Sequence, residues 1–200
     1  MVGALAIAAV GTVNHVLRAP SPIATPTPGT NANAPGIPIR DGTVVGTAGF
    51  ALGDSVAGGQ GQAVDGIACS AQEYATVHVH AHLALFVKGK QVAVPANAGI
   101  PSNGGRAMCL YWLHTHDATG IVHVESPVAN VFTLGHFFDI WGQRLERSRV
   151  AGFAGPVRAY VNGALYEGDL RTIPLIAHQE ITLEVGSYVS PPRYVFPENE

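Results

Sequence analysis

Two groups of histidines combine the residue type and the spacing that metal binding requires. One group alternates along five residues, and the other lies on both sides of a turn. Their members are His78, His80, His82, His114, His116 and His123. Imidazole nitrogens bind zinc, copper, nickel and ferrous iron, and zinc takes them at about 2.0–2.1 Å around one point. The sequence therefore predicts a divalent metal ion at these histidines, with zinc or copper favoured.

The first group, residues 78–82, has the pattern of a β-strand. Side chains alternate across a strand, so the three histidines share one face and the apolar residues between them take the other. Ala84 and Phe86 continue the histidine face with apolar side chains. Both faces are therefore expected to be covered, which would place these histidines in the interior of the protein.

The second group lies around a predicted turn at Asp117-Ala-Thr-Gly120. If these four residues close the loop, His114 lies opposite His123, and directly opposite residues have Cβ atoms about 4.5–5.5 Å apart. A slip of one residue would move His123 to the other face and would separate the candidate ligands. In the predicted register, one face of the two strands carries His114, His116, His123 and Glu125.

Two acidic residues accompany the second group. Asp117 and Glu125 are candidates to accept hydrogen bonds from ligand imidazoles or to act as a base, and Glu125 could instead pair with an arginine. The remaining histidines, His15, His136 and His178, are not expected to be ligands.

A second interpretation of the two groups is a hydrogen-bonded polar cluster in the core. Each imidazole that is buried without a partner would cost about 1–3 kcal/mol. A metal ion would satisfy several imidazoles at once, and this favours the metal site.

Short antiparallel strands are predicted to position these histidines. Two pairs of β-rich runs flank two-residue turns that contain glycine, at Lys88-Gly89 and at Asn162-Gly163, and such pairs are typical of hairpins. The predicted strands are Ala75–Val87, Gln91–Pro95, Met108–Thr115, Ile121–Ser126, Val157–Val161, Ala164–Glu167, Ile181–Val185 and an edge strand at Arg193–Phe196.

One helix is predicted between Thr133 and Gly142. Thr133 is a good N-cap residue, and Gly142 suits the end of a helix. Apolar side chains recur at i, i+3, i+4 and i+7 as a single stripe; they are Leu134, Phe137, Phe138 and Trp141. The sequence therefore predicts a mostly β fold, an antiparallel β sandwich or small barrel with one short helix, preceded by a disordered tether.

Composition excludes several classes of protein. The chain has 200 residues, and 47% of them are hydrophobic, so it can bury a sizeable core. Its 24 Gly and 14 Pro exclude a long helical bundle, because both residues break helices. With a net charge of −3 and two Lys, the chain has no basic patch to neutralise phosphates, which argues against nucleic-acid binding.

The N-terminal part of the chain indicates export. Residues 1–18 contain a short apolar run, typical of a signal peptide or a weak membrane anchor. Residues 19–64 are rich in Pro and Gly, as in an extended linker, and residues 65–200 are expected to form a histidine-rich β domain. We therefore expect an exported protein, periplasmic or extracellular, with an N-terminal membrane tether as one option.

The two cysteines, Cys69 and Cys109, are predicted to form a disulfide. An even number of cysteines in an exported protein favours pairing. The bridge would close a loop of about 40 residues and would stabilise the fold by about 3–4 kcal/mol in the chain-entropy model. Two buried thiols, or a thiolate that binds metal, are the alternatives.

Several longer motifs extend over about residues 61–186. They are His78–Gly89, Cys109–Asp117, Gly120–Pro127, Phe132–Gly142 and Ala159–Gly163. These motifs resemble those of a widespread family of uncharacterised secreted bacterial proteins, which implies a shared domain and carries no known activity. The histidine pattern is also similar to that of cupins, but cupins have the order His-His-Glu-His with flanking glycines, so their chemistry is only an analogy here.

Three functions are consistent with these patterns. The first is an exported metal-binding protein for sequestration, delivery or structural use, whose partner is the metal ion. The second is a metalloenzyme, cupin-like or using zinc-bound hydroxide, which needs an open coordination position and a base. The third is a non-metal extracellular interaction module, in which the histidines pack or act as a pH switch.

Overall fold

The computed structural model describes residues 35–51, 53, 57–198 and 200. The predicted leader (1–18), the first part of the predicted linker and His15 lie outside these residues. Within them the fold is mostly β with one α-helix, as the sequence predicts.

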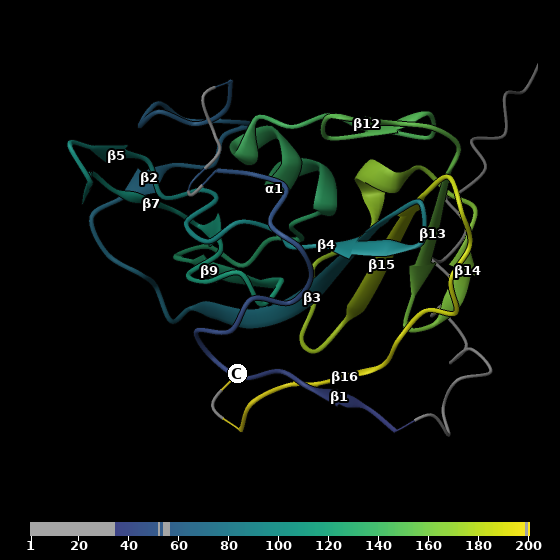
Figure 1. The fold of residues 1–200 in the computed structure, drawn as a ribbon. Helices are drawn as coiled ribbons and strands as arrows, with labels where there is room; N and C mark the ends of the chain where they lie inside the picture. The colour runs from purple at the N-terminus through teal and green to yellow at the C-terminus, as the bar shows by residue number, and fades with distance from the viewer. Residues whose placement is uncertain (1–34, 52, 54–56, 199) are drawn as a thin grey trace, which may run out of the picture.

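A central sheet of seven strands forms the body of the domain (Figure 1). In spatial order its strands are β14 (Ala164–Tyr166), β13 (Val157–Val161), β15 (Glu180–Val185), β3 (Val77–Val87), β9 (Ile121–Ser126) and β8 (Leu113–His114), and β4 (Lys90–Val92) pairs with β3. Every pairing in this sheet is antiparallel except that of β15 with β3, which is parallel. That pair joins strands far apart in the chain, whose relative direction no local turn fixes.

Two tight turns confirm the predicted hairpins. Lys88 and Gly89 have φ angles of 50° and 77°, and Asn162 and Gly163 have φ angles of 50° and 78°. Left-handed backbone at both central residues is typical of a type I′ turn, whose twist matches that of the flanking strands. These turns set the registers of β3 with β4 and of β13 with β14.

Shorter strands surround the central sheet. A three-stranded sheet contains β10 (Leu145–Glu146), β11 (Arg149–Val150) and β12 (Phe153–Ala154). Three two-stranded pairs are β1 (Ile37–Pro38) with β16 (Tyr194–Val195), β2 (Cys69–Ser70) with β7 (Leu110–Tyr111), and β5 (Ser102–Asn103) with β6 (Arg106–Ala107). A 3-10 helix, η1, covers Leu170–Thr172.

The helix α1 (Leu134–Trp141) covers the apolar face of the central sheet (Figure 1). It begins after Thr133 and ends at Gly142, which has a left-handed φ of 74°. Its predicted apolar stripe is fully buried, in one core with Leu83 of β3 and Val124 of β9. Burial of each such large side chain contributes about 1.5–3 kcal/mol, so this face anchors the strands whose other face carries the histidines.

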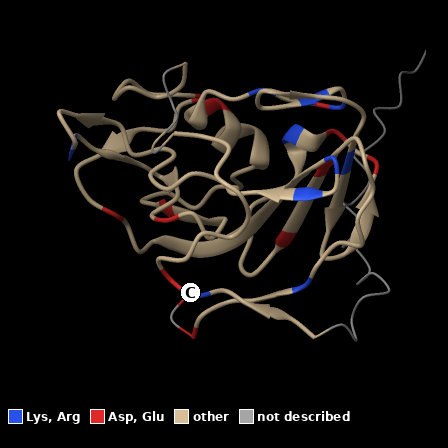
Figure 2. Ribbon diagram, in the orientation of Figure 1, with Lys and Arg blue, Asp and Glu red and all other residues tan. Residues whose placement is uncertain are grey.

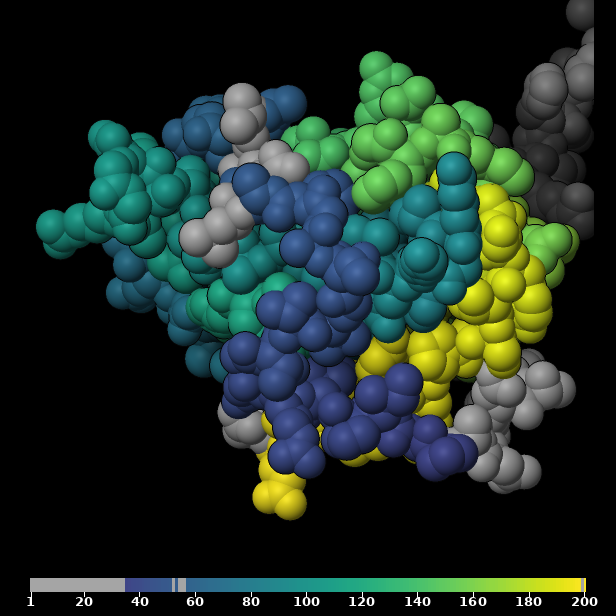
Figure 3. Space-filling model, viewed as in Figure 1, coloured from purple at the N-terminus to yellow at the C-terminus, as the bar shows by residue number. Residues whose placement is uncertain are grey.

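Residues 35–51 pack against the opposite side of the domain, although they belong to the predicted linker. Ile37 pairs with Tyr194, buried Ile39 donates its N–H to Val195 O at 2.9 Å, and Thr47 bridges to Val92 of β4. Figure 3 shows this segment, in purple and blue, lying across the surface of the molecule. The chain upstream of residue 65 therefore contributes to the covering of the histidine face.

A disulfide joins Cys69 to Cys109, as predicted, with Cα atoms 5.5 Å apart. It lies beside the pairing of β2 with β7, in which Cys69 is the partner of Tyr111. The bridge therefore fixes the chain that leads into β3 next to the chain that leads into β8.

Charged residues are distributed unevenly over the ribbon. Lys and Arg gather mainly around β4, β12 and β13, whereas the region of β9 carries acidic residues (Figure 2). This distribution places carboxylates, and few competing cations, near the histidine-bearing strands.

Candidate metal centre

The two histidine groups meet on one face of the central sheet. β9 pairs with both β8 and β3, in registers that place His123 opposite His114 on one side and opposite His80 on the other. The first pairing confirms the register predicted from the turn. The second brings the 78–82 group alongside, an adjacency that no local signal in the sequence predicts. Imidazoles from three neighbouring strands therefore form a row.

Glu125 lies between the two groups. Its partner in register on β3 is His78, and its Oε1 is 3.4 Å from His78 Nε2 and 3.4 Å from His123 Nδ1. The side chain is only 3% exposed, and its ion-pair contacts within the described part of the chain are with these histidines, not with an arginine. Glu125 is therefore positioned to bind a metal ion, as well as to accept a hydrogen bond from a ligand imidazole as predicted.

The nitrogens of His114 and His116 are spaced like two ligands of a tetrahedral metal site. His114 Nε2 and His116 Nε2 are 3.2 Å apart, a separation at which the two rings also form a hydrogen bond. Two ligand atoms at 2.0–2.1 Å from a tetrahedral ion are separated by about 3.3 Å. Candidate ligand atoms within 4.8 Å of one another come from His114, His116, His123 and Glu125.

A main-chain carbonyl orients one of these rings. His114 Nδ1 donates a hydrogen bond to Tyr111 O at 2.8 Å. Because a carbonyl can only accept, Nδ1 carries the proton and Nε2 presents its lone pair to the cluster. This second hydrogen bond is the arrangement that metal-binding histidines normally have.

Burial keeps the central imidazoles neutral. Desolvation, with a smaller contribution from neighbouring imidazoles, lowers the pKa of His80, His114 and His123 to about 4. At neutral pH these rings therefore keep a free lone pair. A metal ion can bind them without first displacing a proton.

Three buried polar atoms of the cluster lack a hydrogen-bond partner within the described residues. They are His80 Nε2, His123 Nδ1 and Glu125 Oε2. Leaving such an atom unsatisfied costs about 1–3 kcal/mol, and more for a charged group. The candidate ligand sets pair Glu125 with His123 and with His80, so cations bound there would give these buried groups a partner.

His82 differs from the other predicted ligands. Its Nε2 donates to Thr119 O at 2.9 Å, its ring lies against Tyr194 with centroids 3.9 Å apart, and it belongs to none of the candidate ligand sets found among the described residues. Strand alternation places His82 on the same face as His78 and His80. It lies further along β3 in the core, where the Thr119 carbonyl accepts a hydrogen bond from one of its nitrogens. We therefore assign His82 a structural role.

Asp117 stabilises the turn through hydrogen bonds that its carboxylate accepts from backbone N–H groups. Its Oδ2 accepts from Gly42 N at 2.7 Å, and its Oδ1 accepts from Thr119 N at 3.0 Å. The side chain of an aspartate in a turn readily bonds the N–H two residues on. Among the described residues its hydrogen bonds are with Gly42 and Thr119 and not with an imidazole, so its predicted role as an acceptor or a base stays a prediction.

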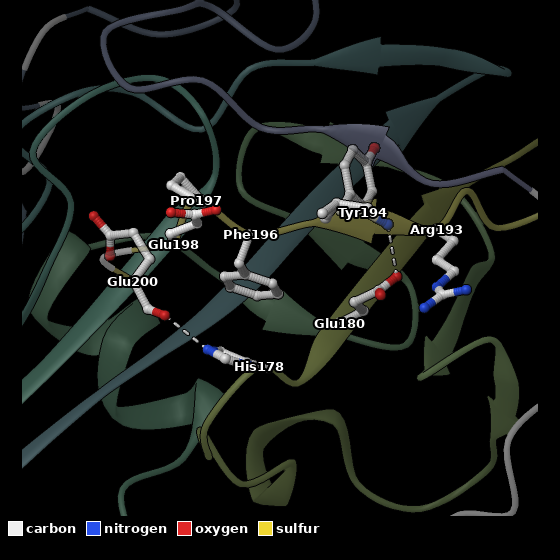
Figure 4. A pocket seen from close by; sticks show the side chains of 9 residues that line it. His178, Glu180, Arg193, Tyr194, Phe196, Pro197, Glu198 and Glu200 are labelled. Carbon is white, nitrogen blue, oxygen red and sulfur yellow. Dashed lines mark hydrogen bonds between the residues drawn. The ribbon is translucent and has the colours of Figure 1, made fainter.

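The two described histidines that were not expected to be ligands lie outside the candidate sets. His136 Nδ1 accepts from Thr133 N at 3.1 Å and so caps the start of α1. His178 Nε2 donates to Glu200 O at 2.8 Å, and its ring stacks on Phe196 (Figure 4).

Two carboxylates at the cluster were not predicted. Glu200 Oε2 is 3.1 Å from His80 Nδ1, and Glu73 Oε1 is 3.3 Å from His116 Nε2. Glu73 precedes β3 in a loop, and Glu200 arrives from the C-terminal segment that follows β16. Neither has a sequence pattern that links it to the histidines, because both contacts are made by loops.

A cavity of about 220 Å³ opens beside the β3 histidines. Its lining consists of His78, Val79, His80, Ala177, His178 and Glu200. A second cavity of about 460 Å³ lies under the C-terminal segment, where Figure 4 shows Glu180 and Glu200 on opposite sides of Phe196. The smaller cavity gives a ligand access to His78 and His80.

No protein-family model, curated protein or solved structure matches this chain. Helices of the length and apolar character needed to cross a bilayer are absent from the described residues. The predicted N-terminal anchor falls in the part of the chain outside those residues.

Proposed function

We propose that this protein is an exported metal-binding protein that holds a divalent ion through His114, His116, His123 and Glu125. The observation that carries the proposal is the convergence of these four ligand atoms within 4.8 Å, with three of the four residues buried and His116 exposed. Two of the residues also contribute buried atoms with no other partner in the described chain, His123 Nδ1 and Glu125 Oε2.

Zinc is the ion that we favour, with copper as the second choice. The four candidate ligands are three imidazoles and one carboxylate, and a site with four protein ligands is typical of zinc. Imidazole and carboxylate are ordinary ligands of zinc.

Four protein ligands favour holding the metal over catalysis at this position. Structural zinc sites are closed by four protein ligands, whereas catalytic sites keep one position for water or substrate. The His116 side chain is 43% exposed, so the site has one ligand at the surface through which the ion can be exchanged. Sequestration or delivery suits such a site.

Export is the second part of the proposal. It is supported by the apolar run and Pro-rich segment at the N-terminus and by the disulfide between Cys69 and Cys109. Disulfides persist in oxidising compartments and are rare in the cytosol. We place the metal-binding domain in the periplasm or the extracellular space, with the N-terminal segment as a leader or membrane tether.

Metal analysis of the purified protein tests the proposal. The full chain, stripped with a chelator and then titrated with Zn²⁺ or Cu²⁺, should bind at least one equivalent. The double variant His114→Ala/His116→Ala should lose that equivalent, and His136→Gln, which alters a histidine outside the site and keeps a capping acceptor, should retain it. Absence of metal in native material together with no uptake of either ion would refute the proposal and favour the interaction module.

A further inference from the structure

His78 and His80 form a second set of candidate ligands beside the first. One atom from each of them and one from Glu125 lie within 4.8 Å of one another. Neither histidine is used by the site proposed above. Glu125 belongs to both sets, because its Oε1 is 3.4 Å from His78 Nε2 and 3.4 Å from His123 Nδ1.

An independent feature indicates that this second set is also built for a cation. His80 is 7% exposed, and its Nε2 is buried with no hydrogen-bond partner in the described residues. Its other nitrogen, Nδ1, faces Glu200 Oε2 at 3.1 Å. A carboxylate on one ring nitrogen commonly orients the other nitrogen towards a metal.

We propose that the cluster is a dinuclear metal centre, in which a second divalent ion is bound by His78, His80 and Glu125. The inference rests on the proposed function for the first ion. Glu125 would be shared by the two ions, because its Oε1 lies 3.4 Å from a nitrogen of each histidine group and its Oε2 has no hydrogen-bond partner in the described residues. The ring centroids of His80 and His123, one from each group, are 4.5 Å apart.

The charges around the cluster suit two divalent cations. Three carboxylates, Glu73, Glu125 and Glu200, each lie within 3.4 Å of a histidine nitrogen. The neutral imidazoles add no positive charge. Bridging carboxylates reduce the repulsion between neighbouring ions, and paired metals in proteins are about 3.5–4 Å apart.

The second ion differs from the first in its access to solvent. It has three protein ligands, and the 220 Å³ cavity is lined by His78 and His80. A fourth position on this ion therefore faces the cavity and can take water or a small anionic ligand. The first ion, with four protein ligands, has no equivalent position.

Titration of the chelator-treated full chain with Zn²⁺ distinguishes one ion from two. We expect two equivalents in the wild type and one in His78→Ala, whose half-exposed side chain can be removed without disturbing the core. His114→Ala/His116→Ala should also keep one equivalent, now at the cavity side.

Loading the protein with Co²⁺ in place of Zn²⁺ gives a signal that depends on whether Glu125 joins the two ions. Two cobalt ions joined by Glu125 should couple magnetically, so the paramagnetic resonance signal of the fully loaded protein should fall below twice that of the singly loaded protein. His78→Ala should restore the uncoupled signal.

Three outcomes are decisive. A single equivalent in the wild type, unchanged in His78→Ala, would overturn the dinuclear centre and leave the proposed function intact. A single equivalent that is lost in both His78→Ala and His114→Ala/His116→Ala would indicate one ion shared between the groups and would also overturn it. No binding at all would refute both proposals.

Discussion

The imidazoles of His80 and His123 face each other across β3 and β9, with ring centroids 4.5 Å apart. This contact joins two histidine groups that are widely separated in the chain. Each ring has a buried nitrogen without a hydrogen-bond partner in the described residues. The contact therefore brings the two histidine motifs together in one cluster. The metal affinity and the stability of the protein should both depend on that cluster.

Replacement of Glu125 by Gln should weaken metal binding strongly. Glutamine keeps the shape of the side chain and removes the charge, so we expect the affinity for Zn²⁺ to fall by at least about 10–100-fold in a competition assay with a chelator. Glu184→Gln is the matched control, because Glu184 is 2% exposed on the same face of the sheet and bonds Val189 N instead of a histidine. Equal losses in the two variants would contradict the assignment of Glu125.

Zinc should stabilise the folded protein. A ligand that binds only the native state stabilises it by about 2.7 kcal/mol when its free concentration is 100 times Kd. We expect Zn²⁺ to raise the Tm of the chelator-treated protein and a chelator to reverse the change. The same rise in His114→Ala/His116→Ala/His78→Ala would show that zinc acts elsewhere.

Metal-free protein should lose stability as the pH falls below about 6.5. Burial lowers the pKa of His82 to about 4, whereas the unfolded chain takes up the proton near 6.5. The unfolded state therefore binds more protons between these values, so the contribution is complete above pH 6.5 and is lost as the pH approaches 4. One such group amounts to about 2 kcal/mol between pH 7 and pH 5.

Denaturant unfolding at the two pH values checks this expectation. His82→Gln removes the titrating group and keeps a donor that can reach Thr119 O, so its free energy of unfolding should depend less on pH than that of the wild type. An unchanged pH dependence in His82→Gln would mean that His82 is not held neutral in the fold.

Removal of the disulfide should destabilise the domain. The bridge from Cys69 to Cys109 closes a loop of 40 residues, and the chain-entropy model gives about 3–4 kcal/mol for a loop of this size. The variant Cys69→Ser/Cys109→Ser should show this loss in denaturant unfolding of the metal-free protein. A free energy of unfolding equal to that of the wild type would contradict the structural role of the bridge.

The parts of the fold that could be predicted from sequence are those set by local signals. The Lys88-Gly89 and Asn162-Gly163 turns defined two hairpins, and the turn after His116 defined the pairing of His114 with His123. Strand alternation placed the 78–82 histidines on one face. Each of these features depends on residues close together in the chain.

Contacts between distant segments could not be predicted in the same way. Besides its hairpin partner β4, β3 pairs with β9 and β15, and neither of these two is joined to it by a short turn. The contact of Glu200 with His80 depends on the path of the C-terminal segment over the sheet. The role of His82 depends on Thr119 O, whose position follows from the packed fold and not from the alternation of side chains.

The hydrogen bond from His114 to Tyr111 O has a consequence for the assembly of the site. Tyr111 is paired with Cys69, and Cys69 is bridged to Cys109, so the acceptor carbonyl belongs to the stretch of backbone that the cystine restrains. Once the disulfide has formed, the carbonyl that orients the His114 ring is restrained, so binding of the proposed ion would require less ordering of this ligand.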